Sequence, residues 1–232
     1  MKLRQLLLKI AGKDGFQLDS RITNGYLFRI CWRYGWMMVR GRLCSLGRNG
    51  ISGHAFIGRG VKLYCKSSIS IGAKAKIHEG VRIDALSTDG VSIGTGAVIG
   101  RNTVMECTGS LEHIGKGIVI GNRSCFGADC FFGAAGGILV GDDVIGGQCI
   151  RFHSENHNYG ELETLIRDQG VTHQGIRVGN NCWIGAGAVF LDGAEIGDGC
   201  VVAANAVVTK KFPANAVIGG VPARILKMRD TK

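Results

Sequence analysis

The chain has 232 residues and a formal net charge of +10, and 38 of its residues are glycine while only 2 are proline. Glycine inside a helix costs about 1 kcal/mol relative to alanine, so this composition excludes a mainly helical fold. Hydrophobic residues make up 45% of the chain, which excludes a disordered glycine-rich linker. No apolar run is long enough to cross a membrane as an ordinary helix. The nine cysteines, an odd number, favour a reducing cytoplasm over a disulfide scaffold.

Residues 1–50 form a basic and aromatic segment that differs from the glycine-rich remainder. They carry ten basic side chains against two acidic ones, and six of the sixteen aromatic residues of the chain. Met1 to Ile10 do not resemble a secretory signal, because no small-residue cleavage site follows the short leucine run.

Residues 24–46 of this segment are predicted to form a helix. A helical wheel brings three arginines within about 40° of one another, with two tryptophans alongside: Arg29, Arg33, Arg40, Trp32 and Trp36. A basic, tryptophan-rich helix is typical of peripheral contact with an anionic membrane surface. The alternative is a helix that packs against the start of the following repeat and caps it, and both can hold together. Nucleic-acid binding is the weaker interpretation, because no recognition motif accompanies the charge.

From residue 51 to residue 212, large apolar residues recur every six positions. The uninterrupted run is Val178, Ile184, Phe190, Ile196, Val202 and Val208. Upstream the spacing occurs in triplets, which are Ile51, Ile57, Leu63; Ile71, Ile77, Ile83; Ile93, Ile99, Met105; Ile114, Ile120, Phe126; and Val140, Gly146, Phe152. A period of six fits a short strand followed by a tight corner, and three such units make one triangular coil.

The corners are predicted at the third residue after each inward side chain. At eleven of these positions the chain has Gly, Asn or Asp, which tolerate a left-handed backbone: Gly60, Gly80, Gly96, Asn102, Gly117, Asp143, Asn181, Gly187, Gly193, Gly199 and Asn205. At the usual spacing between strands, about seven coils stack into a prism roughly 34 Å long with an apolar interior. The sequence therefore predicts an all-β solenoid over residues 51–212.

The repeat is interrupted most strongly after Phe152. The step from Val140 to Val178 is twenty residues longer than a bare coil, so residues 153–177 are predicted to leave the prism as a loop. Three of the six histidines of the chain fall in this loop, namely His153, His157 and His173. Long loops on rigid scaffolds commonly carry function, and an imidazole suits a general base at neutral pH.

Two features follow the loop. Trp183 takes an outward position, where a bare prism would gain little from so large a ring, so it either covers the loop or lines a site beside it. Further on, Pro222 suits the first position of a helix, and residues 213–232 are therefore predicted to end the prism with a short capping helix. Arg224 and Lys227 would share one face of that helix.

Several of these motifs resemble the hexapeptide-repeat acyltransferases. They are Ile184-Gly-Ala-Gly-Ala-Val, Ile196-Gly-Asp-Gly-Cys-Val and Gly219-Gly220-Val221-Pro222-Ala223-Arg224. The resemblance, which extends to the maltose, galactoside and streptogramin acetyltransferases and to polysaccharide O-acetyltransferases, implies a left-handed parallel β-helix. The hand comes from the resemblance alone, since general chain rules favour right-handed crossovers. Acetyl-CoA as co-substrate, no metal, and a homotrimer with sites between subunits are implied as well.

The same resemblance assigns roles to individual residues. His157 corresponds to the catalytic base, with His153 as its rival, and Trp183 is expected against the catalytic histidine and the acyl-pantetheine arm. The other coenzyme contacts are small residues beside the pantetheine and polar or basic residues near the phosphates: Gly185, Ala186, Ala204, Thr209, Lys210, Arg224 and Lys227.

The acceptor side departs from the sugar acetyltransferases. Asp129 falls where those enzymes commonly have an asparagine, and Ala134-Ala135 replaces an acidic pair that they may carry. Their acceptor therefore cannot simply be carried over. Asp129, Tyr159 and His153 are the candidate acceptor contacts.

Taken together, the residues and the resemblance favour an acetyl-CoA-dependent O-acetyltransferase. The acceptor hydroxyl of a saccharide would attack the thioester directly, while backbone amides stabilise the oxyanion. A membrane-contacting segment at residues 24–46 would fit a lipid-linked saccharide in surface-polysaccharide assembly. The expected location is the cytoplasm, at or near the inner membrane surface.

Three other functions remain open at this stage. One is N-acetylation of an amino sugar, and a second is a catalytically silent scaffold, which predicts no coenzyme binding. The third is the metal-dependent carbonic anhydrase built on the same type of prism, which needs three histidines converging on Zn²⁺. His54, His78 and His113 lie on coils, but not in matching registers.

Overall fold

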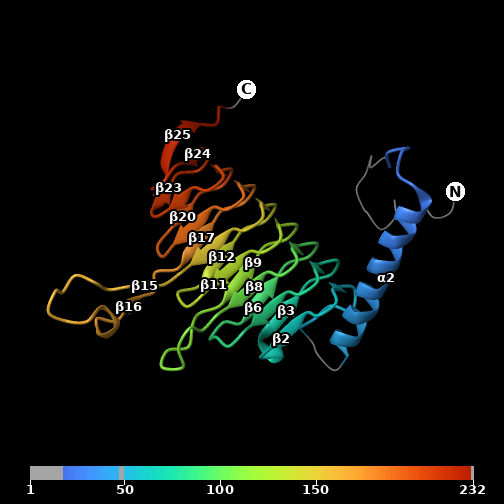
Figure 1. Ribbon diagram of the computed structural model, residues 1–232, viewed down its shortest axis with the longest axis horizontal. Helices are drawn as coiled ribbons and strands as arrows, with labels where there is room; N and C mark the ends of the chain where they lie inside the picture. The colour runs from blue at the N-terminus through green and yellow to red at the C-terminus, as the bar shows by residue number, and fades with distance from the viewer. Residues whose placement is uncertain (1–17, 47–49, 231–232) are drawn as a thin grey trace.

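The computed structural model describes residues 18–46 and 50–230. From residue 50 onward the chain winds into a prism of stacked coils, and a helix lies at the N-terminal end of that prism (Figure 1). Three sheets form the sides of the prism, and the strands of each side come from successive coils and pair in parallel, except the last one. The fold is the left-handed parallel β-helix that the resemblance implies, with seven coils as the repeat predicts.

The first side is a nine-stranded sheet. Its strands in spatial order are β1 (Phe56–Ile57), β4 (Lys76–Ile77), β7 (Val98–Ile99), β10 (Cys125–Phe126), β13 (Ile145–Gly146), β18 (Trp183–Ile184), β21 (Val201–Val202), β24 (Ala216–Gly219) and β25 (Arg224–Met228).

The other two sides each have seven strands. The second side consists of β2 (Lys62–Tyr64), β5 (Arg82–Asp84), β8 (Val104–Glu106), β11 (Phe131–Gly133), β14 (Arg151–His153), β19 (Val189–Leu191) and β22 (Val207–Val208). The third consists of β3 (Ile69–Ile71), β6 (Val91–Ile93), β9 (Ile118–Ile120), β12 (Ile138–Val140), β17 (Ile176–Val178), β20 (Glu195–Ile196) and β23 (Lys211–Phe212). A short 3-10 helix, η1 (Lys66–Ser68), lies between β2 and β3.

The interior of the prism is filled by the side chains of the six-residue repeat. Phe132, Phe152 and Phe190 stack on one another with ring centroids 4.8 Å apart, which matches the spacing between coils. Gly146 takes an inward position because the ring of Phe126 occupies the space that its side chain would need. All eleven predicted corner residues have positive φ angles, between 52° and 129°.

The fourth triplet begins six residues later than predicted. Ile114 is exposed, and Ile120 pairs with Ile93 on one side and with Val140 on the other. The buried triplet is therefore Ile120, Phe126 and Phe132. The six-residue spacing between Ile114 and Ile120 misled the prediction, because the segment from residue 108 to residue 116 is a second, smaller excursion from the prism.

The predicted C-terminal capping helix is wrong. Residues 224–228 form β25, which turns back and pairs antiparallel with β24. An open last coil would expose a row of unpaired backbone N–H and C=O groups, and β25 covers that edge. Arg224 and Lys227 consequently lie on a strand, opposite Gly219 and Val217.

The N-terminal helix is α2 (Asn24–Ser45). The side chain of Thr23 caps it by accepting a hydrogen bond from the Tyr26 N–H, 3.3 Å away. Leu27, Met37 and Gly41 are its buried residues, and Gly41 lies so close to the first coil that a methyl group there would overlap the Ala55 carbonyl oxygen. This confirms the prediction that the helix packs against the start of the repeat.

Two expectations concern membranes and export. Among residues 18–46 and 50–230, no helix combines the length and apolarity that a membrane span requires. The expectation about a secretory signal concerns Met1 to Ile10, which lie outside the described residues.

Candidate active site

The predicted loop leaves the prism directly after β14 and returns at β17. It contains a two-stranded antiparallel ribbon, β15 (Asn156–His157) and β16 (Val171–Thr172), and a short 3-10 helix, η2 (Ile166–Asp168). Figure 1 shows it projecting from the side of the prism. The loop is therefore a structured arm rather than an irregular excursion.

Two buried polar side chains fix the base of this arm. At its start, the Ser154 hydroxyl donates to the Gly133 carbonyl at 2.9 Å and accepts from the Gly136 N–H at 3.0 Å. At its end, the carboxylate of Asp192, only 5% exposed, accepts hydrogen bonds from the Gln174 and Gly175 N–H groups at 2.9 and 2.7 Å and from the Thr172 hydroxyl at 3.2 Å. The arm is thereby held to the coils on either side of it.

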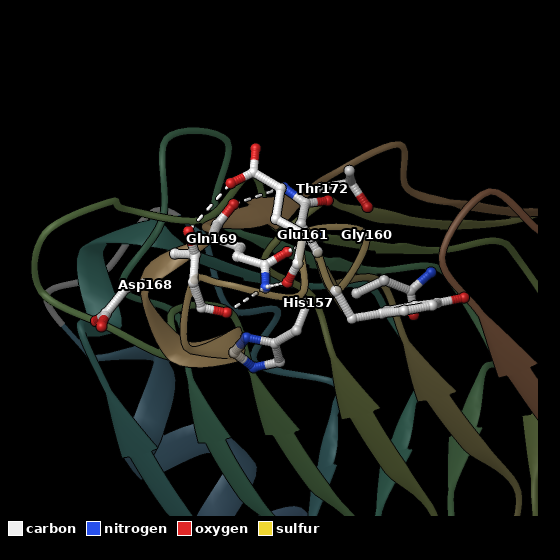
Figure 2. Close-up of a pocket in the computed structure, with 10 residues that line it drawn as sticks. His157, Gly160, Glu161, Asp168, Gln169 and Thr172 are labelled. Atoms are coloured by element: carbon white, nitrogen blue, oxygen red, sulfur yellow. Dashed lines mark hydrogen bonds between the residues drawn. The ribbon is translucent and has the colours of Figure 1, made fainter.

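Gln169 organises the tip of the arm. Its side-chain amide donates to the carbonyls of Glu161 and Thr164 at 2.8 and 2.7 Å and accepts from the Glu161 N–H at 3.0 Å. The Asn158 side chain adds a bond to the Gln169 carbonyl at 3.0 Å. Figure 2 shows these bonds as a cluster, with the imidazole of His157 lying to one side of it.

His157 lines a hollow of about 730 Å³ that is formed by the arm alone. Its ring is exposed, and no hydrogen bond holds it among the residues that the structure describes. Tyr159 lines the same hollow and is 76% exposed. The structure thus brings together two of the candidates named from the sequence, one basic and one aromatic.

His153 is in a different environment. It lies on β14, and its ring packs against Phe131 with the centroids 5.3 Å apart. Burial lowers the pKa of His153, and the positive charge of Arg151 lowers it further. The ring is held on the side of the prism and is absent from the hollow around His157.

The third histidine of the arm is paired. His173 Nε2 lies 2.7 Å from the Glu155 carboxylate, which links the two limbs of the arm near its base. The pair lies between the β15–β16 ribbon and the prism, and it restrains the arm there. Its geometry suits a structural contact.

Trp183 lies on the first side of the prism and not in the hollow. On β18 it pairs with Ile145 and Val201 of the adjacent coils, and its ring is 57% exposed. Ile145 is 58% exposed, so the two side chains form an apolar patch on this side. Within one chain, the structure does not bring Trp183 and His157 into one pocket.

The small coenzyme candidates stack at one corner of the prism. Gly185 lies directly under the Ala203-Ala204 corner, where a side chain at position 185 would collide with the backbone. Ala186 lies in the same way over Gly147. This corner therefore presents a column of small residues and accessible backbone.

The polar and basic coenzyme candidates are spread over the C-terminal coils. Thr209 and Lys210 follow β22 at the corner from which the arm also departs, and the Lys210 ammonium lies 5.7 Å from the centre of the Phe212 ring. Arg224 and Lys227 are exposed on β25. One chain does not gather them into a single cluster.

Asp129 lies at a corner with a positive φ of 61°. Its carboxylate accepts a hydrogen bond from the Asn102 side chain of the preceding coil at 3.2 Å. It is outside the hollow that His157 and Tyr159 line. The described part of the chain, residues 18–46 and 50–230, contains no group of three His, Cys, Asp or Glu side chains placed to hold a metal ion.

Sequence reasoning missed Asp192, Glu155 and Gln169, which give the arm its shape. Corner aspartates also occur at Asp142 and Asp198, where they bond within the prism, so an aspartate at position 192 is not distinctive. No feature of the sequence around it marks Asp192 as different from these.

Comparison with known proteins supports the six-residue repeat and the resemblance to acetyltransferases. Residues 175–210 match the family model described as bacterial transferase hexapeptide (six repeats). A probable acetyltransferase of Mycobacterium tuberculosis is 26% identical over 96% of this chain and 64% of its own length. Galactoside O-acetyltransferase of Escherichia coli is 33% identical over 39% of this chain and 43% of its own. The chain thus spans less than two thirds of either relative.

Two further matches cover parts of the chain. A 2,3,4,5-tetrahydropyridine-2,6-dicarboxylate N-acetyltransferase of Staphylococcus aureus is 49% identical over 53 residues, which are 21% of this chain and 22% of the relative. The crystal structure of a hexapeptide-repeat acetyltransferase from Vibrio cholerae, complexed with acetyl coenzyme A, superposes with a TM-score of 0.51 and 29% identity over 60% of this chain and 71% of that one. In its repeat and its coils, the chain is therefore similar to the hexapeptide-repeat transferases, over residues 175–210 in the family model and over 60% of the chain in the Vibrio cholerae structure.

Proposed function

We propose that the protein transfers an acetyl group from acetyl-CoA to a hydroxyl group of a saccharide. The observation that carries this proposal is the free imidazole of His157 on an anchored arm, lining a hollow of about 730 Å³. The similarity to acetyltransferases, one of them solved with acetyl coenzyme A, supports the coenzyme.

In the proposed reaction, His157 acts as the general base. It takes the proton of the acceptor hydroxyl while the hydroxyl oxygen attacks the thioester carbonyl of acetyl-CoA. The tetrahedral intermediate collapses with cleavage of the carbon–sulfur bond, and protonated His157 returns the proton to the departing thiolate. His157 suits this role better than His153, because the ring of His153 packs against Phe131.

The coenzyme is proposed to lie along the stacked corner of small residues beside Trp183. Gly185, Ala186 and Ala204 keep side chains out of the way, so that the pantetheine arm can approach the backbone. The basic side chains of Arg224 and Lys227 would neutralise the phosphates. The planar guanidinium of Arg224 would give a more directional contact than the ammonium of Lys227.

This arrangement requires a second copy of the chain. Trp183 lies on the first side of the prism, whereas His157 lies on the arm, which leaves the prism at the corner after the second side. One chain alone therefore does not bring base and coenzyme together. We therefore propose a homotrimer in which the arm of one subunit reaches the Trp183 side of the next. Tyr159, which shares the hollow with His157, is a candidate acceptor contact in that site, and Asp129 and His153 are the weaker ones. The cytoplasm, where acetyl-CoA is available, is the proposed location.

Acylation of an amino group is the second candidate. Over a segment of 53 residues the chain is 49% identical to the N-acetyltransferase of Staphylococcus aureus, and this similarity favours N-acylation. The same base and coenzyme site would serve, because His157 would then take the proton from an attacking amine.

Release of free coenzyme A thiol from acetyl-CoA, measured with simple saccharides and with amino sugars as acceptors, tests this proposal. His157→Ala should lower kcat about 100-fold or more, the range expected for loss of a general base. His54→Ala, which removes another exposed histidine, on the first coil at the opposite end of the prism, is the matched control and should behave as wild type. Products that hydroxylamine cleaves are esters, whereas resistant products are amides. Equal rates for wild type and His157→Ala would overturn the assignment of the base.

A further inference from the structure

Helix α2 has a second apolar face. Its first such face, around Leu27, Met37 and Gly41, packs on the first coil. The side chains that project on the opposite side are also apolar, although nothing within the described chain covers them. A surface helix in a monomer normally has polar residues there.

The second apolar face is a continuous row of five side chains. At 100° per residue they fall within about 80° of one another on the helical wheel. We call this row the apolar stripe, and with their exposed fractions its members are Phe28 (61%), Trp32 (60%), Trp36 (47%), Val39 (46%) and Leu43 (61%). The ring centroids of Phe28 and Trp32 are 6.1 Å apart and those of Trp32 and Trp36 are 6.0 Å apart. Exposed apolar residues are ordinary when scattered singly, whereas a contiguous patch indicates a partner.

Positive charge borders the apolar stripe. Arg29, Arg33 and Arg40 lie within about 40° of one another beside it, and within the described chain no carboxylate forms an ion pair with them. The guanidinium groups of Arg29 and Arg33 lie over the rings of Tyr26 and Tyr34 instead.

The absence of acidic residues extends beyond the helix. Residues 20–78 include eleven lysines and arginines and no aspartate or glutamate. This stretch contains α2 and the first coil, so basic side chains predominate at this end of the described molecule, where Asp19 and Glu79 are the bordering carboxylates. Such a field attracts an anionic surface.

We propose that α2 docks in the plane of an anionic phospholipid membrane, with the apolar stripe inserted among the head groups. From Phe28 to Leu43 the stripe is about 22 Å long, so it would lie in the interface and not cross the bilayer. Tryptophan side chains favour this depth, and arginines beside the stripe meet the lipid phosphates. The proposal concerns where the protein acts and does not depend on the acyl-transfer assignment.

Charge argues for a membrane over a second copy of the chain. A symmetric contact between two apolar stripes would bring the arginines beside each stripe toward those of its partner. No carboxylate of α2 is present to compensate, because the helix has no acidic residue. Like charges that face each other across an interface cost affinity, whereas anionic lipid head groups turn the same arginines into favourable contacts.

The test is binding of the full-length protein to vesicles by flotation. Vesicles of phosphatidylcholine alone are compared with vesicles of equal parts phosphatidylcholine and phosphatidylglycerol, at low and at high salt. We expect binding to the anionic vesicles only, weakened by salt. Arg29→Gln/Arg33→Gln should weaken it about 25-fold, at about fivefold for each arginine near the surface. The control Arg101→Gln/Arg167→Gln removes the same charge elsewhere and should bind as wild type.

The apolar contribution is measured separately. Trp32→Ser/Trp36→Ser should abolish flotation, and neither tryptophan is among the buried residues through which α2 packs on the first coil. In a Trp183→Phe background the two tryptophans of the stripe are the only ones in the chain, and lipids brominated in the acyl chains should quench their fluorescence. The proposal is overturned if wild type does not bind anionic vesicles, or if Trp32→Ser/Trp36→Ser binds them as wild type does. If wild type does not bind vesicles and Trp32→Ser/Trp36→Ser changes the oligomeric state, the stripe would instead be a contact with a second copy of the chain.

Discussion

Asp192→Ala tests whether the arm is positioned from its base. The Asp192 carboxylate accepts three hydrogen bonds, of which the one from the Gly175 N–H is the shortest at 2.7 Å. Bonds to a charged group contribute about 1.5–3 kcal/mol each, but Gln174 is exposed, so water replaces part of what is lost. We therefore expect the free energy of unfolding to fall by about 2–4 kcal/mol.

Hydrogen exchange is the most direct assay for this change. In Asp192→Ala the amides of residues 171–175 should exchange faster, while those of the coils upstream of residue 140 should keep their protection. Thr172→Val is the matched comparison, because it removes only the 3.2 Å hydroxyl bond, and it should cost about 1 kcal/mol. Unchanged exchange and stability in Asp192→Ala would refute the view that this carboxylate holds the arm.

Three further predictions concern the helix, the core and pH. Gly41→Ala should loosen α2, because a methyl group at this position overlaps the first coil. Limited trypsin digestion should then cut after Arg40. Gly35→Ala, with open space around the new methyl group, should instead stabilise the protein by about 1 kcal/mol. Phe152→Ala should lower the free energy of unfolding in urea by about 3–5 kcal/mol, because it breaks the stack with Phe132 and Phe190. Burial lowers the pKa of both His78 and His153 in the folded protein, so the unfolded chain binds protons more readily at these two positions. Their contribution to the free energy of unfolding is therefore fully present above about pH 6.5 and is lost as pH falls through the lower folded pKa values. The melting temperature should therefore drop on acidification, and His78→Gln/His153→Gln should lessen that drop; an equal drop would contradict this account.

The repeat made most of the prism predictable. Each inward side chain and each left-handed corner follows local rules, so positions such as Asn102 and Asn181 could be assigned from the sequence. The errors lie where local rules stop applying. The spacing of Ile114 fits the repeat although its segment has left the prism, and Pro222 fits a helix start although the last coil needs a strand to cover its edge.

The site was less predictable than the fold. His157 and the arm follow from the length of the interruption, whereas the contacts of Asp192 and Gln169 depend on how distant segments meet. The separation of Trp183, on the first side of the prism, from His157, on the arm, could not be inferred from spacing within one chain. In the proposed homotrimer they would meet through contacts between chains, and such contacts leave no periodic trace in the sequence.

The central claim is that the stacked corner and the basic last coils hold acetyl-CoA. Calorimetric titration of the folded protein with acetyl-CoA tests it most directly, with wild type beside His157→Ala and Arg224→Ala/Lys227→Ala. We predict equal binding by wild type and His157→Ala, since the proposed base acts on the acceptor. We predict clearly weaker binding by the double variant, which loses the two cations proposed to contact the phosphates. Folded wild-type protein that binds no acetyl-CoA even at millimolar concentration would contradict the account.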